Sequence, residues 1–180
     1  MKKRPPNLIV LVSGRGSNLQ AIIDACTAGT LKSKIKLVVS NKPHVPALDR
    51  AQKAGVPTRV LKSKGLDAET FQQKLLQIVV AEKPDLIVLA GFMKILSHEF
   101  VMTFKGRIIN IHPALLPNFP GLNAVRQTID AHVKVSGCTV HVVDEGCDTG
   151  PILVQKSVPV LEGDSEETLA ERILEQEHVA

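Results

Sequence analysis

The chain has 180 residues, of which 44% are hydrophobic and 22% are charged, and this is enough for one globular domain with a sizeable core. No apolar run approaches the roughly 18 to 20 residues of a membrane-spanning helix, and no signal-peptide cleavage pattern follows the Met-Lys-Lys-Arg start, so we expect a soluble cytoplasmic protein. The net charge of +4 leaves nucleic acid open as a partner, but aromatic residues make up only 3% and neither Trp nor Tyr is present to stack on bases, so we expect none.

Seven apolar runs predict β-strands, and several are the unbroken aliphatic runs typical of parallel strands covered on both faces. They are residues 8–12, 35–39, 58–61, 86–90, 108–112, 139–143 and 152–160. Helical spacing of apolar residues predicts one helix around residues 19–26 and another around residues 71–79. A last helix is expected to begin near Asp164, as N-cap, and to run to the chain end. Strands that alternate with helices indicate right-handed crossovers and an open, doubly wound α/β sheet.

A glycine-rich loop at residues 12–19 follows the first predicted strand and opens the first helix. Gly14 and Gly16 allow backbone N–H groups to approach an anion, and Ser17 or Asn18 can cap the helix. Leu19 stands where a dinucleotide fingerprint has its third glycine, and the Gly-Lys-Ser/Thr of nucleotide hydrolases is absent. The loop therefore favours a phosphate monoester, although a tight turn with a helix cap would have the same sequence.

Asn110 and His112 lie two residues apart at the end of the fifth predicted strand, so their side chains share a face. Ligands of doubly wound sheets bind at the carboxyl ends of strands. The later loop at residues 143–151 offers the carboxylates of Asp144, Glu145 and Asp148. A carboxylate beside His112 would fix its tautomer for proton transfer, and Asn110 could donate to an oxyanion. Taken singly, His112 and His141 could equally be satisfied core or strand histidines, and Asp148 could be only a turn residue. Their combination after strands of one sheet favours a functional site.

Several chemistries find no support in the residue spacing. Gly-x-Ser-x-Gly is absent, which favours direct attack by the substrate's own nucleophile. The six histidines show no metal-binding spacing, so we expect no metal. Cys26, Cys138 and Cys147 are odd in number and lack metal-ligand spacing, so we expect free, buried thiols.

Six segments in family order resemble phosphoribosylglycinamide formyltransferase of purine biosynthesis, within the formyltransferase superfamily. They are Val-Ser-Gly-Arg-Gly-Ser-Asn-Leu-Gln at 12–20, Ala-Gly-Phe-Met-Lys-Ile-Leu at 90–96, Ile-Asn-Ile-His-Pro-Ala-Leu-Leu-Pro at 109–117, Gly-Cys-Thr-Val-His at 137–141, Asp-Thr-Gly-Pro-Ile at 148–152 and Gln-Glu-His at 176–178. The resemblance implies a mostly parallel formyltransferase fold with a Rossmann-like N-terminal half. It also implies transfer of a formyl group from 10-formyltetrahydrofolate, the co-substrate, to the amine of glycinamide ribonucleotide, by a monomer or a homodimer.

The resemblance also assigns roles to matching positions. His112 becomes the general acid/base, Asn110 the oxyanion donor, and Asp148 the group that adjusts the imidazole's proton affinity and orders a water. The remaining roles are substrate binding by Gly16, Ser17 and Asn18 at the phosphate and Glu177 at the ribose, and folate binding by Met93, Lys94, Ile95, Leu96, Val143 and Asp144.

The chain departs from the family pattern at three places. Family members usually continue beyond the Gln-Glu-His helix, so residues 1–180 are expected to form a single domain that lacks the family's C-terminal end. Ala68 stands where many members have Arg, and Asn123 where some have His.

Three other functions remain open. Hydrolysis of 10-formyltetrahydrofolate needs the same Asn, His and Asp, but such hydrolases normally carry a preceding regulatory domain. Formylation of an initiator tRNA would call for an added RNA-binding domain. A noncatalytic phosphate-binding module would use only the glycine loop.

Overall fold

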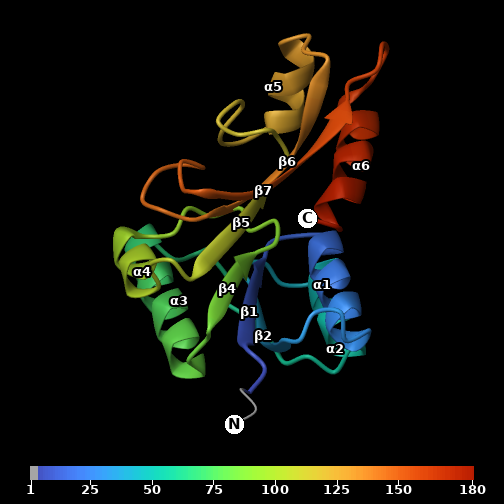
Figure 1. Ribbon diagram of the computed structural model, residues 1–180. Coiled ribbons are helices and arrows are strands. Elements are labelled where there is room, and N and C mark those ends of the chain that lie inside the picture. The colour runs from blue at the N-terminus through green and yellow to red at the C-terminus, as the bar shows by residue number, and fades with distance from the viewer. Residues whose placement is uncertain (1–3) are drawn as a thin grey trace. The chain divides into compact units, whose positions relative to one another are not determined.

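The computed structural model describes residues 4–180, so the Met-Lys-Lys stretch that opens the sequence lies outside the described residues. Strands and helices alternate from β1 to β6, and β7 follows β6 directly before the last helix (Figure 1). The strands are β1 (Asn7–Val12), β2 (Lys34–Ser40), β3 (Thr58–Val60), β4 (Leu86–Leu89), β5 (Ile108–His112), β6 (Val135–Val142) and β7 (Ile152–Pro159). The helices are α1 (Ser17–Thr27), α2 (Pro46–Lys53), α3 (Ala68–Glu82), α4 (His98–Thr103), α5 (Ala124–Asp130) and α6 (Glu166–Glu177).

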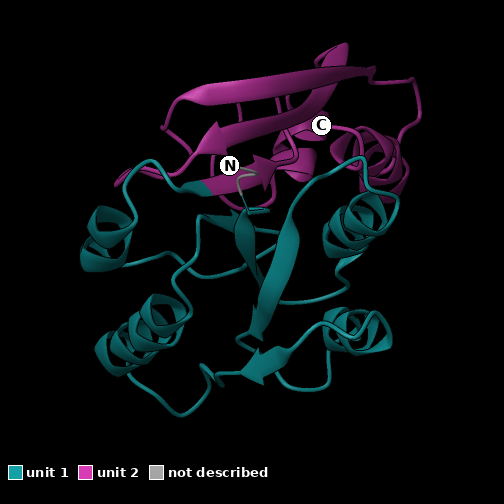
Figure 2. Ribbon diagram, turned by 60° about the horizontal axis from the view of Figure 1, so that its bottom comes forward, with its two compact units in different colours: residues 1–108 teal, residues 109–180 magenta. Residues whose placement is uncertain are grey.

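The chain divides into two compact units, Met1–Ile108 and Ile109–Ala180 (Figure 2). In the first unit the strands lie in the order β3-β2-β1-β4, and every pair is parallel. Helices α1 and α2 cover one face of these strands and α3 covers the other (Figures 1 and 2). Parallel strands covered on both faces explain the unbroken aliphatic sequence of β1, whose residues from Leu8 to Val12 are all buried. The predicted doubly wound α/β architecture is confirmed in this unit.

In the second unit β6 pairs antiparallel with both β5 and β7. The register places Asn110 opposite His141 and His112 opposite Thr139. Helix α6 packs against this unit's strands through a small apolar cluster. Its buried members are Val125, Cys138, Val158, Leu169 and Ile173. One face of β6 therefore belongs to this core, while the other face carries His141.

Most predicted strands agree with the structure to within one residue, but β6 begins at Val135 rather than at residue 139. The sequence does not indicate the first residues of β6, because neither Ser136 nor Gly137 has a strong strand propensity. Gly137 is needed there, since a Cβ at this position would overlap the backbone carbonyl of Lys156 on β7.

Two details of the last helix were predicted wrongly. Its N-cap is Ser165, which forms a capping box with Thr168, while Asp164 instead pairs with Arg172. The helix ends at Glu177 and not at the chain end.

Three short helices, α2, α4 and α5, were absent from the prediction. Each has only six to eight residues, so each contains too few turns for a clear apolar period. One thiol was also misplaced, because Cys147 is exposed while Cys138 is buried and Cys26 is half-buried. No helix within residues 4–180 is long and apolar enough to cross a membrane.

Candidate active site

Strand β5 presents Asn110 and His112 on the same face, as the two-residue spacing predicts. The strand ends at His112, immediately before Pro113. Thr139, opposite His112 on β6, fixes the segment that follows: its hydroxyl donates to the Ala114 carbonyl at 2.7 Å and accepts from the Leu116 amide at 3.1 Å. The backbone beyond His112 is thus anchored to β6 by a fully buried hydroxyl.

The loop between β6 and β7, residues 143–151, is closed by its own polar side chains. Asp144 Oδ1 accepts from the Thr149 hydroxyl at 2.7 Å and from the Gly146 amide at 3.1 Å. A Cβ at Gly150 would overlap the Val142 carbonyl, so only glycine allows the loop to approach β6 this closely. Asp148 itself has a left-handed backbone, with φ of 56°, which aspartate tolerates better than most residues.

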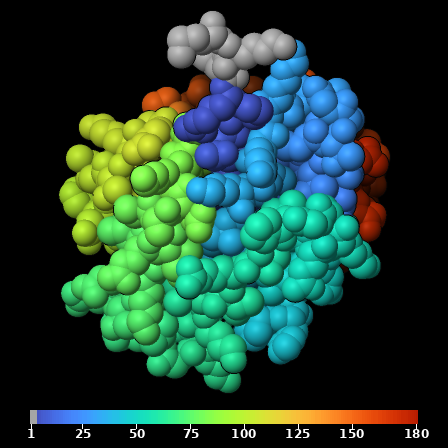
Figure 3. All heavy atoms as spheres, turned by 90° about the horizontal axis from the view of Figure 1, so that it is seen from below, coloured from blue at the N-terminus to red at the C-terminus, as the bar shows by residue number. Residues whose placement is uncertain are grey.

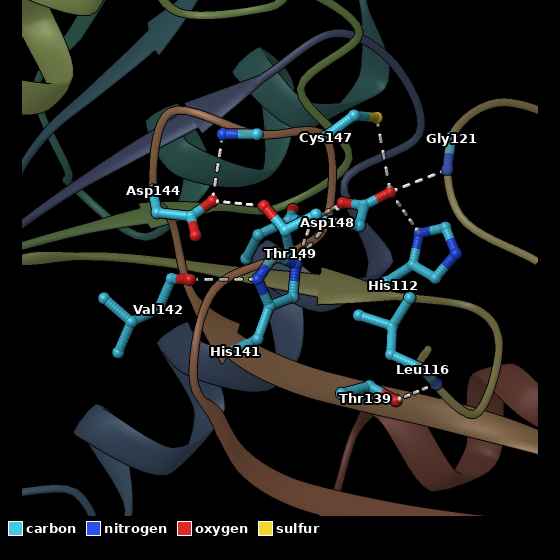
Figure 4. Close-up of polar contacts among 12 residues, drawn as sticks. His112, Leu116, Gly121, Thr139, His141, Val142, Asp144, Cys147, Asp148 and Thr149 are labelled. Carbon is cyan, nitrogen blue, oxygen red and sulfur yellow. Dashed lines mark hydrogen bonds and ion pairs between the residues drawn. The ribbon is translucent and has the colours of Figure 1, made fainter. Parts of the chain in front are cut away.

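Asp148 joins residues from β5, β6 and the segment before α5 (Figure 4). Its Oδ2 atom lies 3.3 Å from His112 Nδ1 and accepts from the Gly121 amide at 2.8 Å. Its Oδ1 atom lies 3.4 Å from His141 Nε2 and 3.4 Å from Asn110 Nδ2. The carboxylate is therefore shared between two imidazoles, an amide side chain and a backbone N–H, and the structure brings together the three residues that the sequence predicted as catalytic.

Each nitrogen of the buried His112 ring has a partner. Nδ1 faces Asp148, and Nε2 lies 2.8 Å from the carbonyl oxygen of Phe119. Because a carbonyl oxygen only accepts, Nε2 carries a proton and donates it. Gln127 holds the same segment from α5, since its side-chain amide donates to the carbonyls of Pro120 and Leu122.

The Asp148 charge is stabilised in this setting. The hydrogen bond from His141, the Gly121 amide and the two nearby imidazoles lower the pKa of Asp148 to about 2, although burial opposes them. Burial lowers the pKa of His141, but Asp148, the Val142 carbonyl and Asp144 outweigh it, so the pKa of His141 is raised. Burial and the neighbouring Asp148 raise the pKa of the Cys147 thiol. The pair Asp148 and His141 therefore favours an ionised carboxylate beside a charged imidazole.

In the first unit, the glycine loop leads into α1 without a side-chain cap. Gly16 is the N-cap and has a left-handed backbone with φ of 72°, whereas Ser17 and Asn18 are the first residues of the helix. The prediction that Ser17 or Asn18 caps α1 is therefore wrong. A Cβ on Gly16 would lie 2.6 Å from the Cβ of Ala47, so the loop packs directly on α2. The close approach leaves the N-terminal amides of α1 at the carboxyl end of β1.

The segment after β4, residues 90–97, contains the predicted folate-binding residues Met93, Lys94, Ile95 and Leu96. Its backbone is held in place by side chains: Ser13 accepts from the Met93 amide at 2.8 Å, and Gln72 donates to the Ile95 carbonyl at 2.6 Å. The side chain of Ile95 is nevertheless 85% exposed and that of Met93 is 61% exposed. Two large apolar side chains are therefore exposed on a backbone that is held by hydrogen bonds.

The other predicted positions lie in the following places. Val143 and Asp144 directly follow β6, and Glu177 is the last residue of α6, where its charge adds to burial in raising the pKa of Cys138 to about 11. Asn123 caps α5 with a left-handed backbone of φ 59°, a conformation that asparagine adopts readily. Ala68 is the first residue of α3, after the N-cap Asp67.

The predicted catalytic residues did not include the second imidazole, His141, which the sequence left open as a core or a site histidine. They did not include the amide of Gly121 either. His141 belongs to the predicted strand and follows Thr139 on the same face, so period-two alternation could have indicated it. No sequence signal identifies the Gly121 amide, because any residue except proline has one.

A cleft of about 630 Å³ lies elsewhere in the first unit, where its strands begin, and it contains none of the predicted site residues. Its lining includes Cys26, Lys34, Pro57 and Glu82. Figure 3 shows the molecule from the side where β1 begins. Among residues 4–180, no group of three or more His, Cys, Asp or Glu side chains is arranged to hold a metal ion.

A sequence profile of the formyl transferase family matches residues 6–180. The chain belongs to the formyl transferase family. It is 44% identical to phosphoribosylglycinamide formyltransferase of Escherichia coli (strain K12), over 96% of this chain and 82% of that protein. It is 48% identical to the trifunctional purine biosynthetic protein adenosine-3 of Drosophila melanogaster, of which it spans 14%. The crystal structure of glycinamide ribonucleotide transformylase 1 from Symbiobacterium toebii superposes with a TM-score of 0.96, at 42% identity over 99% of this chain and 84% of that one.

Proposed function

We propose that this chain transfers the formyl group of 10-formyltetrahydrofolate to the amine of glycinamide ribonucleotide, a step in the de novo synthesis of the purine nucleotide IMP. The observation that carries the proposal is the contact of Asn110, His112 and His141 with the single carboxylate of Asp148. Such a cluster can stabilise an oxyanion and move a proton without a covalent intermediate. The names of the relatives support glycinamide ribonucleotide as the acceptor, and the family resemblance implies 10-formyltetrahydrofolate as the donor.

The chemical step follows from the positions of these groups. The neutral amine of the acceptor attacks the formyl carbon, and the carbonyl oxygen becomes an oxyanion. An N–H of Asn110 and the imidazole of His112 stabilise that charge. The amine then loses a proton as the folate nitrogen gains one and leaves, with His112 and a water ordered by Asp148 as the carriers. Because Nε2 of His112 donates to Phe119, transfer requires the segment before α5 to release this nitrogen.

Four residues are proposed to bind glycinamide ribonucleotide. In the first unit, the amides of Gly16, Ser17 and Asn18 at the N-terminus of α1 would hold the substrate phosphate, as helix N-termini do with anions. In the second unit, Glu177 would bind the ribose hydroxyls.

The folate is assigned to the Met93–Leu96 segment and to Val143 and Asp144. The Asp144 side chain already accepts two hydrogen bonds within its own loop. The backbone of Asp144 is therefore the better candidate to form hydrogen bonds with the heterocycle. We propose two small-molecule substrates, a cytoplasmic reaction, and no part for a metal ion, a nucleic acid or a membrane.

One assay tests the proposal directly. Tetrahydrofolate formation from 10-formyltetrahydrofolate is followed with and without glycinamide ribonucleotide. Product that forms only with the amine is the expected result. Product that forms equally well without the amine would show a hydrolase, and no product in either case would contradict any catalytic function with this donor.

A further inference from the structure

His141 is a second buried imidazole on Asp148, and the proposed chemical step leaves it without a role. Its side chain is 2% exposed, and three polar groups surround its ring. Nδ1 lies 3.0 Å from the Val142 carbonyl oxygen, while Nε2 lies 3.2 Å from Asn110 Nδ2 and 3.4 Å from Asp148 Oδ1. The ring thus contacts both the proposed oxyanion donor and the carboxylate.

The partners of the ring determine which nitrogen carries a proton. A carbonyl oxygen can only accept, so Nδ1 is protonated and donates to Val142. Nε2 then has two possible states. Without a proton it accepts from the Asn110 amide, and with a proton it donates to Asp148.

These two protonation states of His141 differ in whether an N–H of Asn110 is available to a substrate. When Nε2 is unprotonated, the Asn110 amide nitrogen has one acceptor at His141 and another at Asp148. These two acceptors can bind both of its hydrogens. When Nε2 is protonated, it no longer accepts, and it competes with Asn110 for Asp148 Oδ1. An N–H of Asn110 is then free to meet a developing oxyanion.

We propose that His141 is a positioning residue whose imidazolium form binds Asp148 Oδ1 and so releases an N–H of Asn110 for the substrate oxygen. The inference rests on the proposed formyl transfer for its catalytic consequence. Its structural part is that the hydrogen bonds of the Asn110 amide depend on the protonation of His141 Nε2. This part rests on the observed contacts alone.

The groups that face the ring favour this charged form. Asp148 and Asp144 of the loop after β6 both stabilise the imidazolium and raise the pKa of His141. From β5, His112 lies on the other oxygen of Asp148 and competes for the same negative charge. The Cys147 thiol also contacts Asp148, at 3.8 Å, as a weak donor. The active form is therefore the imidazolium of His141, and this form is lost as the pH rises.

Two substitutions separate positioning from packing. His141→Gln keeps an amide near the place of Nε2 but cannot titrate, whereas His141→Leu removes every polar contact. The exposed His132 has a left-handed backbone with φ of 51°, so His132→Asn is a control that removes an imidazole without strain.

In the parent, kcat is expected to fall as the pH rises through the pKa of His141. That fall should be missing in His141→Gln and present in His132→Asn. His141→Leu should lower kcat by on the order of 100-fold with little change in KM, as expected for a misplaced catalytic group. A His141→Gln profile that superimposes on the parent profile, or a His141→Leu variant within twofold of the parent, would overturn the proposal.

A second readout does not depend on catalysis. The side-chain amide of Asn110 is observed by ¹⁵N NMR, with its signal assigned by its loss in Asn110→Ser. Its resonance should follow the titration of His141 in the parent and lose that step in His141→Gln. An Asn110 signal that keeps the same steps in both proteins would refute the coupling. If no formyl transfer occurs but the coupling is found, the proposed function fails and the positioning contact survives.

Discussion

Replacing Asp148 by asparagine removes one negative charge while preserving the shape of the side chain. The carboxylate is 13% exposed and lies 3.3 Å from His112 and 3.4 Å from His141, so water screens these contacts only partly. The Gly121 amide donates to it as well, at 2.8 Å. We expect Asp148→Asn to destabilise the protein in a way that depends on pH.

The magnitude follows from the lowered pKa. The pKa of Asp148 falls from an ordinary 3.8 to about 2. Each unit of difference between these two pKa values corresponds to about 1.4 kcal/mol. The ionised carboxylate therefore contributes roughly 2 kcal/mol to the free energy of unfolding. Because this pKa is depressed, the contribution is fully present above pH 3.8 and is lost as the pH falls toward 2.

The titration of His141 sets the highest pH at which His141 and Asp148 are both charged. Its pKa is raised above 6.5, so the stabilisation from the charged imidazole is fully present below pH 6.5 and is lost as the pH rises through the folded value. Both members of the pair are charged between about pH 4 and pH 6.5, from these two values. The stability difference between the parent and Asp148→Asn should therefore be largest in that range.

Urea denaturation at several pH values from 3 to 9 measures this difference. The control is Asp130→Asn, which removes a carboxylate that is 59% exposed and pairs with Arg126 four residues earlier on α5. Such surface pairs contribute about 0.5 kcal/mol or less. If Asp148→Asn proved no more destabilising than Asp130→Asn at pH 5, or if its effect were identical at pH 5 and pH 9, the assignment of the charge pair would be wrong.

Two further substitutions test the neighbouring groups. His112→Ala should lower turnover by at least about 100-fold, the usual contribution of a general acid/base, while binding of the phosphorylated amine survives; steady-state kinetics and calorimetry measure the two effects, and near-normal turnover would contradict the assignment. Gln155→Leu removes the amide that donates to Leu116 O at 2.8 Å and to the Thr139 hydroxyl at 2.9 Å, and it should lower the free energy of unfolding by about 1 to 3 kcal/mol in urea denaturation. An effect no larger than that of the exposed Gln73→Leu would show that this network stabilises little.

Much of the fold could be predicted because the signals are local. Aliphatic runs identified β1, β2, β4 and β5 to within a residue or so, since strands covered on both faces are rich in apolar side chains. Short helices such as α2 were missed because their apolar period covers barely two turns. The N-cap of α6 was misplaced by one residue because Asp164 and Ser165 are both good caps, and only the ion pair of Asp164 with Arg172 decides between them.

By itself, the sequence determined that an amide and an imidazole share one face at the end of β5, because strand geometry alternates side chains whatever surrounds them. It also placed a glycine-bounded acidic loop after β6. The residue pattern alone left Asp144, Glu145 and Asp148 open as the partner of His112, and the family resemblance implied Asp148. The tertiary structure shows Asp148 beside His112, while the Asp144 side chain accepts hydrogen bonds within its own loop. Only the tertiary structure added His141 and the Gly121 amide to that carboxylate, because contacts between residues far apart in sequence depend on strand register and loop closure, which no local pattern encodes.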